Sequence, residues 1–150
     1  MNIEYKKLDE SYLEAFMETR IRQLREEGAT EDLDLKPSLR DYYNRHMGDG
    51  TFVSWIAMDG DKIIGTSGVS FVEKPPYFSN PTGKIGLISS MFTDPGYRRL
   101  GIARELLSRV VNEAREYGCG VIHITASDMG VPLYLNFGFV KNGNFLQYKL

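Results

Sequence analysis

The chain has a single cysteine, Cys119, and two histidines, His46 and His123, among its 150 residues. One thiol excludes an intramolecular disulfide and every Cys-x-x-Cys metal or redox motif. Two histidines far apart in the sequence do not have the spacing of a structural metal site. We therefore expect a protein that binds no metal and works in the reducing setting of the cytoplasm.

Long apolar runs are also missing, since no stretch approaches the roughly 18 apolar residues that cross a bilayer. The first residues lack the apolar run of a secretory signal peptide. A net charge of −2 argues against general affinity for nucleic acid, which requires a basic face. We expect neither a membrane nor a nucleic acid as a partner, and an anionic ligand would need a local cluster of positive groups.

Several enzyme signatures are absent as well. There is no G-x-G-x-x-G after a strand, no Walker A lysine motif and no G-x-S-x-G elbow. The composition, 42% hydrophobic and 25% charged, is that of an ordinary globular protein. The length fits one domain, residues 1–150, because two domains would each be marginal in size.

Apolar periodicity and turn residues predict alternating strands and helices. Strands are expected at residues 3–8, 51–58, 62–73, 84–93, 121–125 and 145–150, and helices from 9 or 11 to about 27, from 37 to 47, at 101–117 and at 133–137. The last strand would close the sheet. This order favours an α/β fold in which a mixed sheet carries helices on its faces.

Residues 91–104 contain the most informative turn of the chain. They leave one predicted strand, pass Asp94-Pro95-Gly96, and enter the amphipathic helix at 101–117. A helix N-terminus offers unpaired N–H groups and the positive end of its dipole, which together suit a phosphate. Gly101 and Ala103 keep bulky side chains away from those groups.

The same turn concentrates positive charge in a slightly acidic protein. Arg98, Arg99 and Arg104 bring three guanidinium groups to it, and arginine binds phosphate in bidentate fashion. The spacing Arg-x-x-Gly-x-Ala alone also fits an ordinary helix start with a solvated basic turn. Its place between a strand and a helix favours phosphate binding.

Residues 93–103 match the pattern V-x-P-x-Y-R-x-x-G-I-G/A, with Thr93 in the Val position. In this the chain resembles the GNAT superfamily of acyl-CoA transferases. The resemblance implies a mixed, mostly antiparallel central sheet of six or seven strands flanked by about four helices. It also implies acetyl-CoA as the co-substrate, with its pyrophosphate on the helix start and its pantetheine arm paired to the strand backbone. The implied cofactor-binding residues are Met91, Phe92, Thr93, Arg98, Arg99, Leu100, Gly101, Ile102, Ala103, Arg104 and Ser127.

A second stretch is similar to the family ending N-x-x-A-x-x-L-Y-x-x-x-G-F. Leu133-Tyr134, Gly138 and Phe139 fall in register with it, about thirty residues beyond the first motif. The resemblance places Tyr134 beside the CoA sulfur, where a phenol with a pKa of about 10 could protonate the leaving thiolate. The alternative is a core aromatic residue. Ser127 stands where many members carry Asn, and it would alternatively cap a turn.

The sequence leaves the identity of the general base open. Relatives in the family commonly supply a Glu from the central strand or from the strand after the long helix, but here the strands at 84–93 and 121–125 carry no carboxylate. His123, Glu73, Asp128 and an ordered water remain as candidates, and a buried structural role is the alternative for His123. The acidic residues between 26 and 34 would steer a cationic amine or would form a solvated helix end.

Together the residues and the resemblance indicate an N-acetyltransferase that acts on a primary amine of a small molecule, with Tyr134 as the general acid. A non-catalytic acyl-CoA-binding sensor or partner module of the same fold is the alternative, because no base is evident. The acceptor, the use of longer acyl groups and the presence of a homodimer are left open by the sequence.

Overall fold

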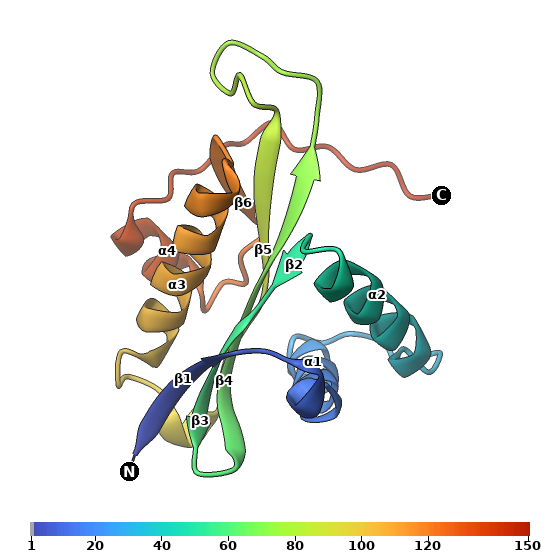
Figure 1. Cartoon of the computed structure of the whole chain (residues 1–150), viewed down its shortest axis with the longest axis vertical. Coiled ribbons are helices and arrows are strands. Elements are labelled where there is room, and N and C mark those ends of the chain that lie inside the picture. The colour runs from blue at the N-terminus through green and yellow to red at the C-terminus, as the bar shows by residue number, and fades with distance from the viewer. Residues whose placement is uncertain (1) are drawn as a thin grey trace.

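The computed structural model describes residues 2–150, whose arrangement is drawn in Figure 1. In chain order the elements are β1 (Ile3–Lys7), the 3-10 helix η1 (Glu10–Tyr12), α1 (Leu13–Glu26), α2 (Lys36–Gly48), β2 (Phe52–Val53), β3 (Trp55–Asp59), β4 (Lys62–Glu73), β5 (Lys84–Thr93), the 3-10 helix η2 (Pro95–Tyr97), α3 (Ile102–Tyr117), β6 (Val121–Ile124) and α4 (Val131–Phe137).

One six-stranded sheet forms the centre of the molecule. Its strands follow the order β1–β3–β4–β5–β6, and the short β2 pairs with β4. Every pairing is antiparallel except that of β5 with β6, which is parallel. Four α-helices accompany this sheet within residues 2–150. The mixed, mostly antiparallel sheet expected from the sequence is therefore confirmed.

The helices cover both faces of the sheet. Helices α1 and α2 lie against one face, and α3 lies against the other (Figure 1). Phe16, Met17 and Tyr43 belong to the core on the α1–α2 side, and Leu107 and Val110 belong to the core under α3. Each fully buried apolar side chain of this size contributes about 1.5–3 kcal/mol to folding, so both layers are firmly held.

Two glycines let α3 approach the sheet closely. A Cβ at Gly65 in β4 would lie 3.0 Å from the Ile102 side chain, and one at Gly86 in β5 would lie 3.1 Å from Cβ of Ala114. Gly65 pairs with Thr93, the last residue of β5. The missing side chain at Gly65 therefore lets the first turn of α3 lie beside the end of β5, where the sequence predicts the phosphate site, and Gly86 makes room for the later part of the helix.

The expected last strand, residues 145–150, is wrong for the single chain. Residues 139–150 form no regular secondary structure, and all side chains from 140 to 150 are exposed. The reason is physical: a strand needs a neighbour for its backbone groups. After α4 the chain leaves the body of the protein and ends clear of the sheet (Figure 1).

Smaller differences from the expected elements have local causes. The predicted strand 51–58 divides into β2 and β3 at Ser54, whose hydroxyl donates to the carbonyl of Ser67. Helix α4 begins two residues earlier than expected, with Pro132 in its first turn, where proline needs no N–H partner.

Candidate active site

The far half of β5 has a free edge. The parallel pairing with β6 runs from Ile85 opposite Val121 to Ile88 opposite Ile124, whereas β5 continues to Thr93. Beyond Ile124 the chain makes no further pairing with β5 and continues to α4. The two strands therefore separate, and residues 89–93 of β5 keep a neighbour only on the β4 side.

Alternation along β5 decides which backbone groups of residues 89–93 point away from β4, toward the free edge of the strand. Phe92 pairs with Thr66 in β4, and the N–H of Asp94 donates to the carbonyl of Ile64 at 2.9 Å. In an antiparallel pair the residue between two such positions turns its N–H and C=O outward. Thr93 is that residue. Of the three predicted pantetheine-pairing residues, Phe92 is thus the one engaged with β4.

A bulge precedes this stretch. The register between β4 and β5 shifts between Thr66 and Gly68, and Ser90 adopts a positive φ of 59°. A side chain in this conformation costs roughly 1–2 kcal/mol, so the packing around it must hold it there. The hydroxyl of Ser90 is buried without a hydrogen-bond partner, while its carbonyl accepts from the Thr66 hydroxyl at 2.6 Å. Bulges of this kind re-aim backbone groups beside active sites.

Two side chains reach the carbonyls of this free stretch. Gln23 of α1 donates from Nε2 to the carbonyl of Met91 at 3.1 Å, and Arg98 donates from Nε to the carbonyl of Thr93 at 3.0 Å. A carbonyl oxygen has two lone pairs, so each one can accept a further hydrogen bond from a ligand. Gln23 itself is buried.

The start of α3 is bare, as phosphate binding requires. Its N-cap residue, Gly101, has a φ of 80°, and no side chain caps the helix. The first intrahelical bond runs from the N–H of Glu105 to the carbonyl of Gly101, which leaves the amides of residues 102–104 without intrahelical partners. A Cβ on Gly101 would meet nothing within 4 Å, so no other side chain crowds the N-cap position.

The three predicted arginines divide between two sides of this turn. Arg99 is exposed, and Arg104 lies over the ring of Phe137 and donates to Asn136 at 3.3 Å. Arg98 instead points toward α1, where its guanidinium lies 3.9 Å from Glu26. Ile102 is buried beneath the helix, whereas Leu100 is exposed.

The turn that carries these groups is tied to the sheet. The Tyr97 hydroxyl donates to the carboxylate of Asp59 at 2.6 Å, which joins η2 to the β3–β4 hairpin. Asp94 accepts from the N–H of Gly96 at 3.3 Å and from Arg22 of α1 at 3.2 Å. These contacts fix the path from β5 to α3.

Tyr134 lies in α4 and is 7% exposed. Its ring packs edge-on against Phe139 at 5.8 Å, and a Cβ on Gly130 would come within 2.8 Å of it, so Gly130 makes room for the ring. Burial, followed by the negative charge of Glu27, raises the pKa of Tyr134 to about 12. The phenol is therefore protonated at neutral pH.

Ser127 caps the turn before α4. Its hydroxyl accepts from the N–H of Gly130 at 3.3 Å, and its carbonyl accepts from the N–H groups of Gly130 and Val131 at 2.9 and 3.1 Å. This is the capping arrangement that the sequence offered as the alternative to a cofactor contact. The hydroxyl group of Ser127 can still donate its own O–H to a further partner.

The candidate bases lie at different distances from the gap. Glu73 pairs with Lys84, the first residue of β5, whereas Thr93 is the last. At about 3.3 Å per residue, Glu73 therefore lies roughly 30 Å from Thr93. His123 is exposed and pairs with Leu87, before the strands separate. Asp128 lies in the exposed turn before α4.

Glu27, which the sequence offered only as part of an acidic cluster, lies closer to the free edge of β5. Its Oε1 accepts from Nε2 of Gln23 at 3.2 Å, and the same amide nitrogen holds the carbonyl of Met91. The negative charge of Glu27 also contributes to the raised pKa of Tyr134. The i,i+4 spacing of Gln23 and Glu27 was the available signal, but only the fold brings this pair to β5.

Most of the other acidic residues in that cluster have partners. Glu31 pairs with Arg25 at 2.8 Å, Glu26 with Arg22 at 3.4 Å, and Asp34 accepts from the N–H of Lys36 at 3.1 Å. The ion pairs of Glu31 and Glu26 are typical of a solvated helix end. Glu27 is the carboxylate of this cluster whose contacts lead to β5, through Gln23.

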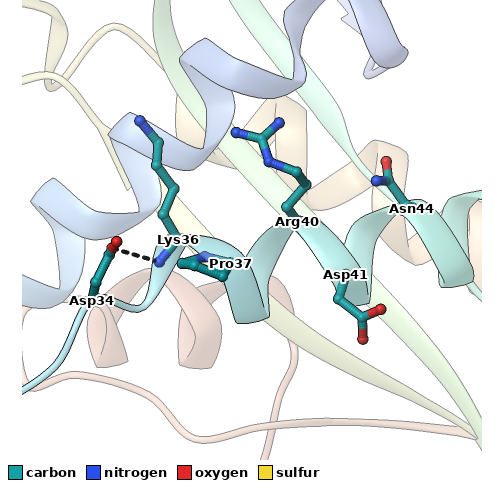
Figure 2. Close-up of a pocket in the computed structure, with 6 residues that line it drawn as sticks. All are labelled: Asp34, Lys36, Pro37, Arg40, Asp41 and Asn44. Carbon is teal, nitrogen blue, oxygen red and sulfur yellow. Dashed lines mark hydrogen bonds between the residues drawn. The ribbon is translucent and has the colours of Figure 1, made fainter.

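A surface hollow at the start of α2 is separate from the region around β5 and the start of α3 (Figure 2). It is lined by Asp34, Lys36, Pro37, Arg40, Asp41 and Asn44. Its cations are already paired: Lys36 and Arg40 each lie 2.7 Å from the carboxylate of Glu14 in α1. Both cations of this hollow are therefore already engaged with Glu14. Among residues 2–150, no three His, Cys, Asp or Glu side chains are grouped as metal ligands.

The site therefore joins an uncapped helix start, a free strand edge and a buried tyrosine. Residues 11–139, which include both motifs, match the family model of the Acetyltransferase (GNAT) family. The chain belongs to the GNAT family. Its sheet and helices match solved GNAT structures, so the fold implied by the resemblance is confirmed.

Individual relatives agree with this GNAT assignment. A crystal structure of a predicted acetyltransferase with acetyl-CoA from Clostridium acetobutylicum is 34% identical, with a TM-score of 0.95 over 99% of this chain and 96% of that one. A GCN5-related N-acetyltransferase from Ralstonia eutropha JMP134 is 26% identical, with a TM-score of 0.86 over 99% of each chain. N-acetyltransferase 8B of Rattus norvegicus is 29% identical over 115 residues, 74% of this chain and 50% of that protein. The chain spans about half the length of the curated relatives it matches.

Proposed function

We propose that this GNAT chain is an N-acetyltransferase that transfers the acetyl group of acetyl-CoA to a primary amine of a small molecule. The observation that carries the proposal is the junction of three features: the uncapped start of α3, the free edge of β5 and the buried phenol of Tyr134. Relatives named N-acetyltransferases, and a relative crystallised with acetyl-CoA, support it.

The coenzyme would lie along this junction. Its pyrophosphate would accept hydrogen bonds from the free amides of residues 102–104, with Arg99 and Arg104 supplying positive charge. Its pantetheine amides would pair with the outward backbone groups of Met91 and Thr93, in the manner of an added strand. Arg98, which holds the carbonyl of Thr93, would position that strand end rather than grip the pyrophosphate.

The reaction would proceed by direct attack. The amine nitrogen attacks the thioester carbonyl carbon, the C–S bond breaks, and its electron pair stays on sulfur as a thiolate. A thiol has a pKa near 8.5, below the value of about 12 for Tyr134. Tyr134 would therefore stabilise the thiolate mainly by donating a hydrogen bond, and protonation of the sulfur would be completed with a proton released by the amine.

Glu27 would accept the proton that the amine must lose. We expect Glu27→Gln to lower kcat/KM at pH 7 by about tenfold to a hundredfold, because general bases contribute about that much or more. The loss should shrink at high pH, where the amine is already neutral, and the Kd for acetyl-CoA should not change. A pH profile of kcat/KM measures both effects.

Glu31→Gln is the matched control for this prediction, since Glu31 is a nearby carboxylate that pairs with Arg25. It should leave the profile unchanged. An unaltered profile for Glu27→Gln would remove Glu27 from the mechanism and return the role to a water molecule or to His123.

A panel of amines tests the function itself, read by the release of free CoA thiol from acetyl-CoA. We expect turnover with at least one class of primary amine. Tight acetyl-CoA binding without turnover across a broad panel would instead identify the chain as a non-catalytic acyl-CoA-binding module.

A further inference from the structure

Arg20 of α1 has no carboxylate partner within residues 2–150. The other two arginines of this helix, Arg22 and Arg25, lie 3.4 and 2.8 Å from carboxylates. The guanidinium of Arg20 makes one hydrogen bond within the described chain, from Nη1 to the side-chain oxygen of Gln23 at 3.0 Å. Because a guanidinium carries five N–H donors, most of those on Arg20 are left for another partner.

The position of Arg20 makes this unpaired charge informative. The side chain is half-buried. Removing a charge from water costs free energy unless an opposite charge replaces part of the lost hydration. Glu18, the nearest acidic residue in the sequence, does not supply that charge, because it pairs with Lys36 of α2. A half-buried guanidinium in this state is suited to an anionic ligand.

A buried hydroxyl without a hydrogen-bond partner lies close to Arg20. Ser90, in the bulge of β5, is 3% exposed, and its Oγ has no partner within residues 2–150. Tyr43 of α2 connects the two residues: burial raises the pKa of its phenol, whereas the Ser90 hydroxyl and the positive charge of Arg20 lower it. Such effects act over short distances, so the three side chains lie together. The approach of Ser90 to this phenol falls short of a well-aligned hydrogen bond, so its O–H still lacks an acceptor.

Arg20 lies on the same side of α1 as Glu27. The two residues and Gln23 are spaced by three and four positions, which brings them to one face of the helix end. Gln23 turns this face toward β5 through its bond to the carbonyl of Met91. The side-chain amide of Gln23 also joins the two charges, because its oxygen accepts from Arg20 and its nitrogen donates to Glu27. A cation and a carboxylate therefore lie at the two ends of one amide, beside the free stretch of β5.

We propose that the acceptor is a small amine that also carries a carboxylate, as an amino acid does. The carboxylate would pair with Arg20, whose planar fork binds carboxylates in bidentate fashion, and would accept from the Ser90 hydroxyl. The amine would lie at Glu27, which is exposed and therefore accessible. This assignment rests on the proposed function and names the class of acceptor for the same site.

The products follow from the chemistry of that acceptor. The amine nitrogen forms a bond to the acetyl carbon, the C–S bond breaks, and the N-acetyl amino acid and CoA thiol are formed. The ammonium group gives up two protons in all. One ends on sulfur, and the other passes through Glu27 to solvent.

Matched acceptors test the role of the carboxylate. The common α-amino acids and unbranched ω-amino acids of increasing length are each compared with their neutral primary amides, read by release of CoA thiol. In the wild type, kcat/KM for the preferred amino acid should exceed that for its amide by about tenfold to a hundredfold, because hydrogen bonds to charged groups contribute about that much. Arg20→Gln should abolish this preference by lowering kcat/KM for the amino acid alone. Arg20→Lys, which keeps the charge without the planar fork, should retain part of it.

Two further variants sharpen the test. Arg25→Gln is the matched control, since Arg25 is an arginine of α1 that already pairs with Glu31, and it should keep the full preference. Ser90→Ala should reduce the preference by a smaller factor, about twofold to tenfold, because a single hydrogen bond from a neutral hydroxyl contributes less. Unchanged turnover of the amides by each variant, together with far-UV circular dichroism, shows that it is folded.

The possible outcomes separate this inference from the proposed function. A wild type that acetylates amines without regard to a carboxylate, or a preference that survives Arg20→Gln, overturns the inference and leaves acetyl transfer intact. An equal loss for amino acid and amide in Arg20→Gln also overturns it, since Arg20 would then only support the helix. No turnover of any amine by the wild type would instead overturn the proposed function, and the acceptor assignment with it.

Discussion

Replacing Tyr134 with Phe lowers kcat for acetyl transfer by an order of magnitude or more and leaves the Kd for acetyl-CoA nearly unchanged. The substitution removes only the hydroxyl, because the ring keeps its contact with Phe139 and its place beside Gly130. The group removed is the one that we propose donates a hydrogen bond to sulfur as charge develops on the leaving thiolate. An interaction made only in the transition state lowers kcat and leaves ground-state binding intact.

The measurement pairs steady-state kinetics with calorimetry of acetyl-CoA binding. Tyr77→Phe is the control, since Tyr77 lies in the loop between β4 and β5 and should not affect either quantity. A variant at Tyr134 with full activity would show that the phenol only packs. A parallel loss of coenzyme affinity would show that it supports binding rather than the chemical step.

The pH dependence of this effect follows from the environment of Tyr134. Burial and the nearby Glu27 raise the pKa of Tyr134 to about 12, so its hydroxyl keeps its proton up to about pH 10. The ratio of wild-type to Tyr134→Phe rates should therefore stay constant between pH 6 and pH 10. A decline in that ratio within this range would mean that the phenol ionises there, in conflict with its buried position.

The first motif could be placed from the sequence because its determinants are local. A glycine at the helix start, small residues after it and a proline turn before it act within about ten residues of one another. The helix that follows is marked by apolar residues on one face, six of which are buried in the structure: Ile102, Leu106, Leu107, Val110, Val111 and Ala114. The strand–turn–helix unit and the mixed sheet therefore agree with prediction.

The residues that the sequence could not place depend on long-range contacts. Gln23 and Met91 meet across 68 positions of the chain, so the link from Glu27 to β5 exists only in the folded protein. The positive φ of Ser90 arises from a register shift between two strands, and no local turn residue marks it. The predicted strand at 145–150 was wrong for one chain because alternation indicates strand character but not the strand that will be its neighbour.

Reversing the charge of both Arg99 and Arg104 to Glu weakens acetyl-CoA binding at least a hundredfold. Each charge-assisted hydrogen bond to phosphate contributes roughly 1.5–3 kcal/mol, and two of them account for about two to four orders of magnitude in Kd. New negative charges beside the helix start would also repel the pyrophosphate. Arg104 lies over Phe137 and Arg99 is exposed, so neither substitution removes a buried contact.

A truncated ligand separates this electrostatic effect from damage to the fold. Acetyl-pantetheine carries the thioester and the amides that would pair with β5, but it has no pyrophosphate. Its affinity should be the same for the wild type and for the double reversal, while the affinity for acetyl-CoA falls and becomes less dependent on salt. Arg45→Glu, at an exposed position of α2 that pairs with Asp41, should bind both ligands as the wild type does. Equal losses for both ligands would mean that the arginines support the structure of the turn, and the diphosphate would then have to be held by the helix amides alone.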